Sequence, residues 1–195
     1  GFSVLLEPLE SGFYLSRAQA SGFYSLALIC LTIAVLGSHY LLSRISVALN
    51  SAIVCGTAVF GLVIAALANT AWEFGLGYGV LFGSANGFGY ALSLQLAARA
   101  YPQRRGLAIG TVTALYAVGA SFFAIITGAM LKPFGLSGVM GGMAAILSLA
   151  LVVVMILVRS TDISTRNSKL DVKDSLRGSA RLQIWLWLGY LGACT

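Results

Sequence analysis

Charged residues are scarce in this sequence of 195 residues. Asp, Glu, Lys and Arg together make up 9% of the chain, against roughly 25% in ordinary soluble domains. Hydrophobic residues make up 58%, and the mean hydropathy is +0.91. A soluble protein of this length has too small an interior to hide so much apolar surface. The composition therefore excludes a soluble globular domain and indicates a membrane protein.

Residues that carry enzymatic chemistry are also scarce. His39 is the only histidine, so motifs with zinc-ligand spacing such as H-E-x-x-H are absent from the sequence. Cys30, Cys55 and Cys194 lie singly in apolar surroundings, which is typical of small packing residues rather than of ligands or disulfide partners. We therefore predict no enzyme, no metal site and no cofactor.

Long apolar runs are what the sequence does contain. Five of them carry no Asp, Glu, Lys or Arg: Ala20 to Leu42, Ile45 to Trp72, Phe74 to Ala98, Gly106 to Leu131 and Pro133 to Val158. Each exceeds the roughly 20 residues, at about 1.5 Å rise, that cross a hydrocarbon core of about 30 Å. The runs predict five complete membrane-spanning helices, and hence an all-α polytopic membrane protein.

The two ends of the chain read as incomplete spans. The opening "GFSVLLEPL" has the pattern of a span that is ending, and "LQIWLWLGYLGACT" at the other end is apolar but too short to cross. We therefore expect a fragment truncated within its first and seventh spans. Residues 1–158 would form an N-terminal transmembrane bundle, 159–181 a cytoplasmic central loop, and 182–195 the start of span seven.

Basic residues are divided very unevenly between alternate loops. Ten of the twelve lie on one side: Arg44, Arg99, Arg104, Arg105, Arg159, Arg166, Lys169, Lys173, Arg177 and Arg181. Because Lys and Arg accumulate in cytoplasmic loops, we predict that loops 39–48, 99–105 and 159–181 are cytoplasmic and that the membrane is the plasma (inner) membrane. The net charge of +6 then follows from topology and requires no nucleic-acid partner.

The loop at 159–181 has two interpretations. The favoured one is a linker that also anchors the chain by charge; the alternative is an amphipathic helix on the inner leaflet.

One motif resembles a catalytic signature. Residues 135–138, Gly-Leu-Ser-Gly, match the GxSG of rhomboid-type intramembrane serine proteases, whose serine needs a histidine within hydrogen-bond reach. The expected topology puts Ser137 at the outer end of one span and His39 at the inner end of another, about 30 Å away. The protease interpretation is therefore disfavoured.

Glycines recur at every fourth position in the third complete run, at Gly75, Gly79, Gly83 and Gly87. At 100° per residue they share one face with small and polar side chains. The opposite face carries the bulky residues Phe74, Leu81, Phe88 and Leu92. The glycine face fits close packing against another helix or the border of a polar cavity, and the bulky face fits lipid.

Asn86 is the unusual residue of this run. It lies at the midpoint of Phe74 to Ala98, where an unpaired amide in hydrocarbon is costly. It needs either a partner on another helix or water in a pathway, and the sequence leaves both open. Tyr90 shares its face, and Tyr116 and Ser121 lie near the midpoint of the next run. These four residues are our candidates for a solute pathway.

The segment "YGVLFGSANGFGYALSLQLAARAYPQRRGLAIGTVTALYAVGASF" resembles spans four and five of the major facilitator superfamily. Its pattern Tyr101-Pro102-x-x-Arg105-Gly106-x-Ala108-x-Gly110 is similar to the oxalate/formate antiporter and monocarboxylate-porter branches. The resemblance covers essentially the whole chain. It implies a six-helix half-bundle of a twelve-span transporter, whose two halves move alternately around a midplane site. A C-terminal half of the same chain would then be a partner.

One family signature is altered here. The loop between spans two and three of the family resembles G-x-L-x-D-R-x-G-R-R, and residues 39–48 read His-Tyr-Leu-Leu-Ser-Arg-Ile-Ser-Val-Ala. Arg44 is kept, but Ser43 replaces the Asp that the family uses as a gating contact. The inner-gate and loop candidates are therefore His39, Arg44, Arg104 and Arg105.

The resemblance implies secondary active transport of small solutes across the bilayer, with small organic anions (mono- or dicarboxylates) as the leading substrate class. No Lys or Arg lies inside a predicted span, so the cation that balances such an anion would belong to the second half. A proton-coupled drug or sugar carrier is one alternative, although it would need an intramembrane acid. The other is a non-transporting sensor or scaffold that uses the glycines only for assembly.

Overall fold

The computed structural model describes residues 2–42 and 47–160. The helical segments are η1 (Phe2–Leu5), α1 (Leu6–Phe13), α2 (Arg17–Leu42), α3 (Val47–Leu67), α4 (Ala71–Phe74), η2 (Gly75–Phe82), α5 (Gly83–Ala100), η3 (Pro102–Arg104) and α6 (Arg105–Ser160). No strand occurs in these two ranges. The expected all-α fold is confirmed. Arg44, Cys194 and the predicted loop and seventh span from residue 161 onward lie outside the described residues.

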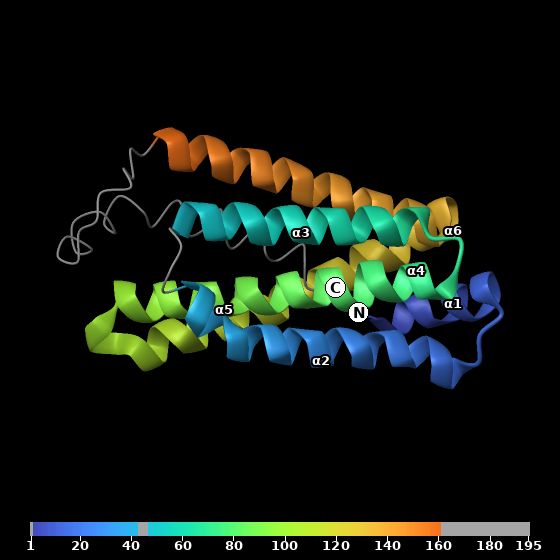
Figure 1. Ribbon diagram of the computed structural model, residues 1–195, viewed down its shortest axis with the longest axis horizontal. Helices are drawn as coiled ribbons and strands as arrows, with labels where there is room; N and C mark the ends of the chain where they lie inside the picture. The colour runs from blue at the N-terminus through green and yellow to red at the C-terminus, as the bar shows by residue number, and fades with distance from the viewer. Residues whose placement is uncertain (1, 43–46, 161–195) are drawn as a thin grey trace.

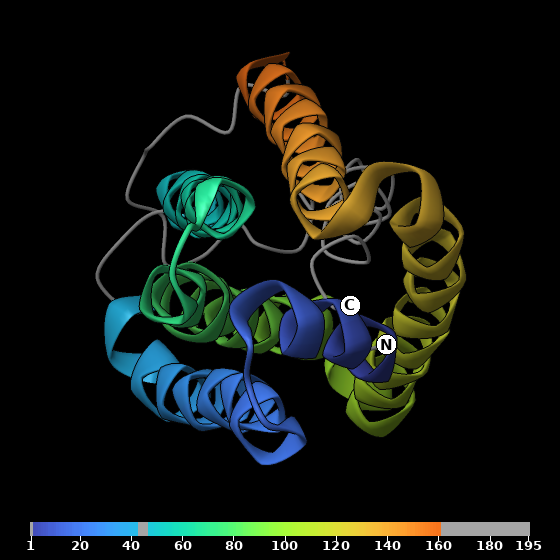
Figure 2. The ribbon, with the colours of Figure 1, turned by 90° about the vertical axis from the view of Figure 1, so that its right-hand side faces the viewer.

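The long helices run lengthwise beside one another as a bundle (Figure 1). Three helical stretches are long and apolar enough to cross a membrane: Arg17–Ser38, Leu49–Leu67 and Pro102–Val153. The last contains 52 residues, more than twice the length that one crossing needs. It folds back on itself, and seen end-on (Figure 2) its two arms lie on different sides of the bundle. Segments α4, η2 and α5 follow one another without a break and form a further rod through the bundle.

The break within α6 lies where the sequence predicts the boundary between two spans. Pro133 interrupts the helix, and Gly135 has φ 64° and ψ −172°, a conformation that is essentially restricted to glycine. A Cβ at Gly138 would lie 2.5 Å from the Cβ of Phe134. The glycines of the GxSG motif are therefore explained by the turn between the two arms.

The predicted boundary between the spans Ile45 to Trp72 and Phe74 to Ala98 is wrong by several residues. Helix α3 ends at Leu67, and Trp72 belongs to the next helix. The cause is a capping box. The Thr70 hydroxyl accepts a hydrogen bond from the Glu73 backbone N–H at 3.3 Å, and the Glu73 carboxylate accepts one from the Thr70 N–H at 3.1 Å. Reciprocal bonds of this kind fix the first residue of a helix.

The expectation that the bulky face of this helix meets lipid is wrong for Phe74 and Leu92. Their exposed fractions are 0% and 4%. Leu92 lies beyond η2, a π-helix whose wider i→i+5 turns rotate the residues after it relative to the 100° wheel. Phe74 precedes η2, and its ring packs against those of Phe13 and Phe23. In addition, the rod contacts α2, α3 and α6, which leaves it no broad lipid-facing side.

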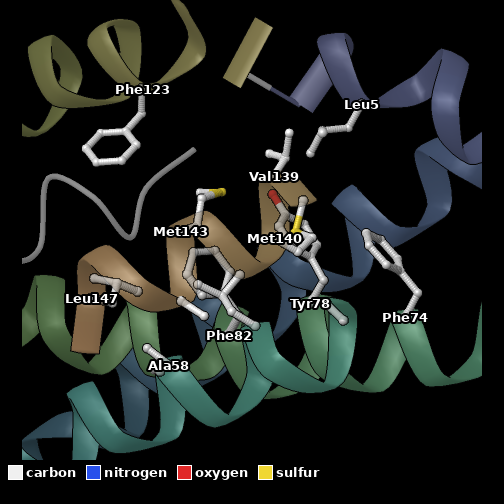
Figure 3. Packing of buried hydrophobic residues seen from close by; sticks show 14 of the residues in the cluster. Leu5, Ala58, Phe74, Tyr78, Phe82, Phe123, Val139, Met140, Met143 and Leu147 are labelled. Atoms are coloured by element: carbon white, nitrogen blue, oxygen red, sulfur yellow. The ribbon is translucent and has the colours of Figure 1, made fainter. Parts of the chain in front are cut away.

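The core lies along η2. The rings of Phe74 and Tyr78 stack with centroids 5.5 Å apart, and those of Tyr78 and Phe82 with centroids 5.3 Å apart. Figure 3 shows Tyr78 and Phe82 beside Met140 and Met143 from the second arm of α6. This apolar column holds the rod in place, so that the polar residues farther along it have fixed positions.

Candidate functional site

Asn86 lies near the middle of the continuous helical stretch 71–100 and is 8% exposed. Its Nδ2 donates a hydrogen bond to the Tyr116 hydroxyl of α6 at 3.3 Å. The structure therefore gives Asn86 a partner on another helix, which is one of the two arrangements that the sequence left open. It also brings together two of the four candidate residues from separate predicted spans.

Tyr90 lies one helical turn farther along α5 and makes the second contact with α6. Its hydroxyl is 3.2 Å from Oγ1 of Thr113. The rings of Tyr90 and Tyr116 lie with centroids 4.9 Å apart at an interplanar angle of 57°. Asn86, Tyr90, Thr113 and Tyr116 thus form one connected group, which we call the polar cluster.

Thr113 is the member of the polar cluster that sequence reasoning missed. It precedes Tyr116 by three residues, and residues three apart on a helix share a face, so its position relative to Tyr116 could have indicated it. Ser121, by contrast, is not brought to the cluster by any described contact. Its Oγ donates to the Ala117 carbonyl oxygen at 3.0 Å within α6, and its side chain is exposed.

The glycines place the cluster by packing α5 against α2. A Cβ at Gly83 would lie 2.8 Å from the Ala27 carbonyl oxygen, and a Cβ at Gly87 would clash with the Leu31 carbonyl oxygen. Gly75 and Gly79 face side chains of α2: an added Cβ would lie 3.1 Å from Phe23 at Gly75 and 2.8 Å from Leu26 at Gly79. The glycines thus touch α2 directly, whereas Asn86 and Tyr90 reach α6 through their hydrogen bonds.

A second close approach fixes the rod against α3. A Cβ at Gly77 would lie 2.6 Å from the Gly61 carbonyl oxygen, and a Cβ at Gly61 would lie 2.7 Å from that of Gly77. The two backbones are therefore in direct contact, and neither glycine can be enlarged without separating the helices. Gly61 and Gly77 lie outside the series of glycines four residues apart, so that series did not indicate this contact.

The polar cluster is uncharged. It consists of one amide, two phenols and one aliphatic hydroxyl, which can donate and accept hydrogen bonds but provide no strong base or nucleophile. Among the described residues, no group of three His, Cys, Asp or Glu could hold a metal ion. The arrangement can bind and orient a small polar solute.

The residues predicted for the inner gate are only partly described. Arg104 ends η3 and Arg105 begins α6, and both side chains are exposed. Tyr101 accepts a backbone hydrogen bond from the Arg104 N–H at 3.1 Å, which stabilises the short turn that Pro102 opens. His39 belongs to α2 by its backbone. The gating role of these residues stays a prediction.

A bundle of long apolar helices with an uncharged polar cluster between two of them is the architecture of a helical membrane protein. The family model of the Major Facilitator Superfamily matches residues 1–195, and the chain belongs to this family. It is therefore a multi-pass membrane protein and a secondary transporter of small solutes; members of the family are transporters rather than enzymes. Neither a curated protein nor a solved structure gives a significant match to the chain.

Proposed function

We propose that the protein is a carrier of small organic anions, mono- or dicarboxylates, that works as an antiporter in the plasma membrane. The polar cluster would form its half of the solute site. The observation that carries this proposal is the pairing of α5 and α6 through Asn86–Tyr116 and Tyr90–Thr113, in the middle of the rod. The similarity of residues 101–110 to the oxalate/formate and monocarboxylate branches supports the substrate class.

The polar cluster opens on one side. Asn86 is buried, Tyr90 and Tyr116 are half-buried and Thr113 is exposed. Thr113, Ala117 and Ser121 follow one another at four-residue spacing and are all exposed, so this face of α6 is small and polar. The large side chains Val118, Phe122 and Ile125 are 65%, 61% and 72% exposed and fit lipid. The small polar face then fits a water-filled pathway, because polar side chains at membrane depth face cavities or protein.

Amide and hydroxyl donors can bind a carboxylate, but they do not balance its charge. The described spans hold no Lys or Arg near the cluster, since Arg99, Arg104 and Arg105 lie at the helix ends. We expect the balancing cation in a C-terminal half of the protein, packed against the open face of α6. The site would then form between the two halves.

The alternatives find less support in the described residues. A proton-coupled drug or sugar carrier would need an acidic relay, and Glu73, the acid nearest to the cluster along the rod, lies at its first turn. A scaffold would present its glycines to another protein. Gly83 and Gly87 are instead covered by α2 of the same chain, so the glycine face serves packing within the bundle.

The test is transport by the full-length protein in proteoliposomes, measured as counterflow with labelled formate and oxalate. We expect Asn86→Leu to reduce transport at least tenfold more than Ser84→Leu, two residues away on the same helix, because only Asn86 belongs to the cluster. Melting temperatures of both variants control for misfolding. Equal, near-normal transport by the two variants would remove Asn86 from the pathway and contradict the proposal.

A further inference from the structure

Thr113 has one hydroxyl proton and two hydrogen-bonding neighbours. Its Oγ1 donates to the Ile109 carbonyl oxygen at 3.1 Å, one turn back in α6. The same oxygen lies 3.2 Å from the Tyr90 hydroxyl, where the distance alone allows either atom to donate. A carbonyl oxygen can only accept. Both bonds therefore exist together only if the Tyr90 hydroxyl donates its hydrogen bond to Thr113 Oγ1.

The reverse arrangement is unfavourable. If Thr113 turned its proton toward Tyr90, the Thr113 and Ile109 oxygens would face each other at 3.1 Å with no proton between them. Bonds from Thr to the carbonyl four residues back are a local property of helices, so the Ile109 bond forms whether or not a solute is present. The position of the Tyr90 ring is also fixed, because it packs on the ring of Tyr116.

We infer that Thr113 is a positioning residue that turns the hydroxyl proton of Tyr90 toward α6, so that Tyr90 offers only acceptor lone pairs to the pathway. This polarity is opposite to that of Tyr116, whose oxygen accepts a hydrogen bond from the Asn86 amide. The two phenols, which pack against each other from α5 and α6, therefore have different roles. The consequence for transport rests on the function proposed above, whereas the direction of the Tyr90–Thr113 bond does not.

The solute class follows from this polarity. An acceptor at the open side of the cluster binds a hydrogen-bond donor and repels a bare carboxylate oxygen. Tyr90 would therefore favour a carboxylate that also carries a hydroxyl group over the same carboxylate without one. The two solutes are discriminated because both displace the water bound to the Tyr90 oxygen, but only the one with a hydroxyl group replaces its hydrogen bond.

The direction of the bond can be measured without any solute. The relative intensity of the tyrosine ring doublet in Raman spectra depends on whether the phenolic hydroxyl donates or accepts. We expect Thr113→Val in the purified full-length protein to change this doublet, and Thr113→Ser to leave it unchanged. The change should vanish when Tyr90→Phe is the background. An unchanged doublet in Thr113→Val, or a change that persists with Tyr90→Phe, would overturn the inference.

The solute preference is tested by uptake of labelled glycolate and acetate, which differ by one hydroxyl group. We expect the wild type to favour glycolate about fivefold, the ratio that one ordinary hydrogen bond contributes. Thr113→Val should lose the preference, because the Tyr90 proton is then free to turn toward the solute, and Thr113→Ser should keep it. An equal preference in wild type and Thr113→Val would contradict the role of Thr113. Uptake of neither solute would contradict the solute class inferred here, whereas the formate and oxalate counterflow tests the proposed function separately and the Raman result decides the bond direction.

Discussion

The helical stretch from Ala71 to Ala100 meets its two neighbours α2 and α6 in different ways. Against α2 it presents glycines, and at Gly83 and Gly87 the backbones themselves are in contact. Against α6 it presents Asn86 and Tyr90, which reach Tyr116 and Thr113 through hydrogen bonds of 3.3 and 3.2 Å. The first contact has no room for another atom, and the second is made of groups that also bind water.

This difference separates a fixed part of the bundle from an adjustable part. Close backbone contact is stabilised by many small dispersion terms that all weaken when the helices move apart. A hydrogen bond between neutral side chains contributes only about 1 kcal/mol net, and water or a solute can replace either partner. We therefore expect α2 and the rod to move together as one rigid unit. A solute should bind between the rod and α6, where it can replace the side-chain hydrogen bonds.

The largest expected effect comes from filling the α2 contact. Gly87→Ala places a methyl group against the Leu31 carbonyl oxygen and 2.9 Å from the Ala34 Cβ, and we expect a loss of about 3 kcal/mol of stability. Thermal unfolding of the detergent-solubilised protein measures it. Gly110→Ala is the control, because a Cβ there meets nothing within 4 Å and alanine is the better helix former. Equal melting temperatures for the two variants would show that the contact is loose.

A smaller effect is expected on the α6 side. Tyr116→Phe removes the acceptor of the Asn86 bond but keeps the ring that packs on Tyr90. Stability should fall by about 1 kcal/mol, while transport falls much further. Melting temperature and uptake measured on the same preparation separate the two effects. A variant that loses stability but transports normally would assign the bond to structure alone.

Gly75→Ala should be close to neutral. The added Cβ meets only the ring edge of Phe23 at 3.1 Å, which a side chain can relieve, and the gain in helix propensity offsets the strain. We expect a change within about 0.5 kcal/mol by thermal unfolding. A loss as large as that of Gly87→Ala would mean that Gly75 packs as tightly as Gly87, which the distances do not indicate.

The smallest effect concerns the first turn of the rod. The backbone N–H groups of Asn69 and Thr70 bind the Glu73 carboxylate and hold its pKa below the ordinary 4.5. The ionised form is thus favoured by folding, so this stabilisation is present above pH 4.5 and is lost as the pH falls through the lowered folded-state pKa. Melting temperature should therefore decline as the pH falls below 4.5, and less so in Glu73→Gln. An identical decline in both would exclude Glu73 as its cause.

The sequence was sufficient for the helical class, for the break near Pro133 and for Asn86, Tyr90 and Tyr116 as candidates. Their pairing was not predictable, because it depends on how two spans are rotated about their axes. The face of Phe74 was predicted wrongly because a helical wheel does not show the neighbours Phe13 and Phe23 that cover its ring. The helix start at Thr70 was readable, because Thr-x-x-Glu is a capping signal. Thr113 was missed because threonine is common in apolar helices.

The central claim is that the α6 face bearing Thr113 borders a water-filled pathway, whereas the opposite face meets lipid. The measurement is the reaction of a water-soluble thiol reagent with Thr113→Cys and Val118→Cys in full-length protein in membranes, with the native cysteines replaced. Both positions are exposed in the bundle, so exposure alone does not distinguish them. We predict rapid labelling of Thr113→Cys and none of Val118→Cys. Equal labelling of the two, or labelling of Val118→Cys alone, would contradict the account.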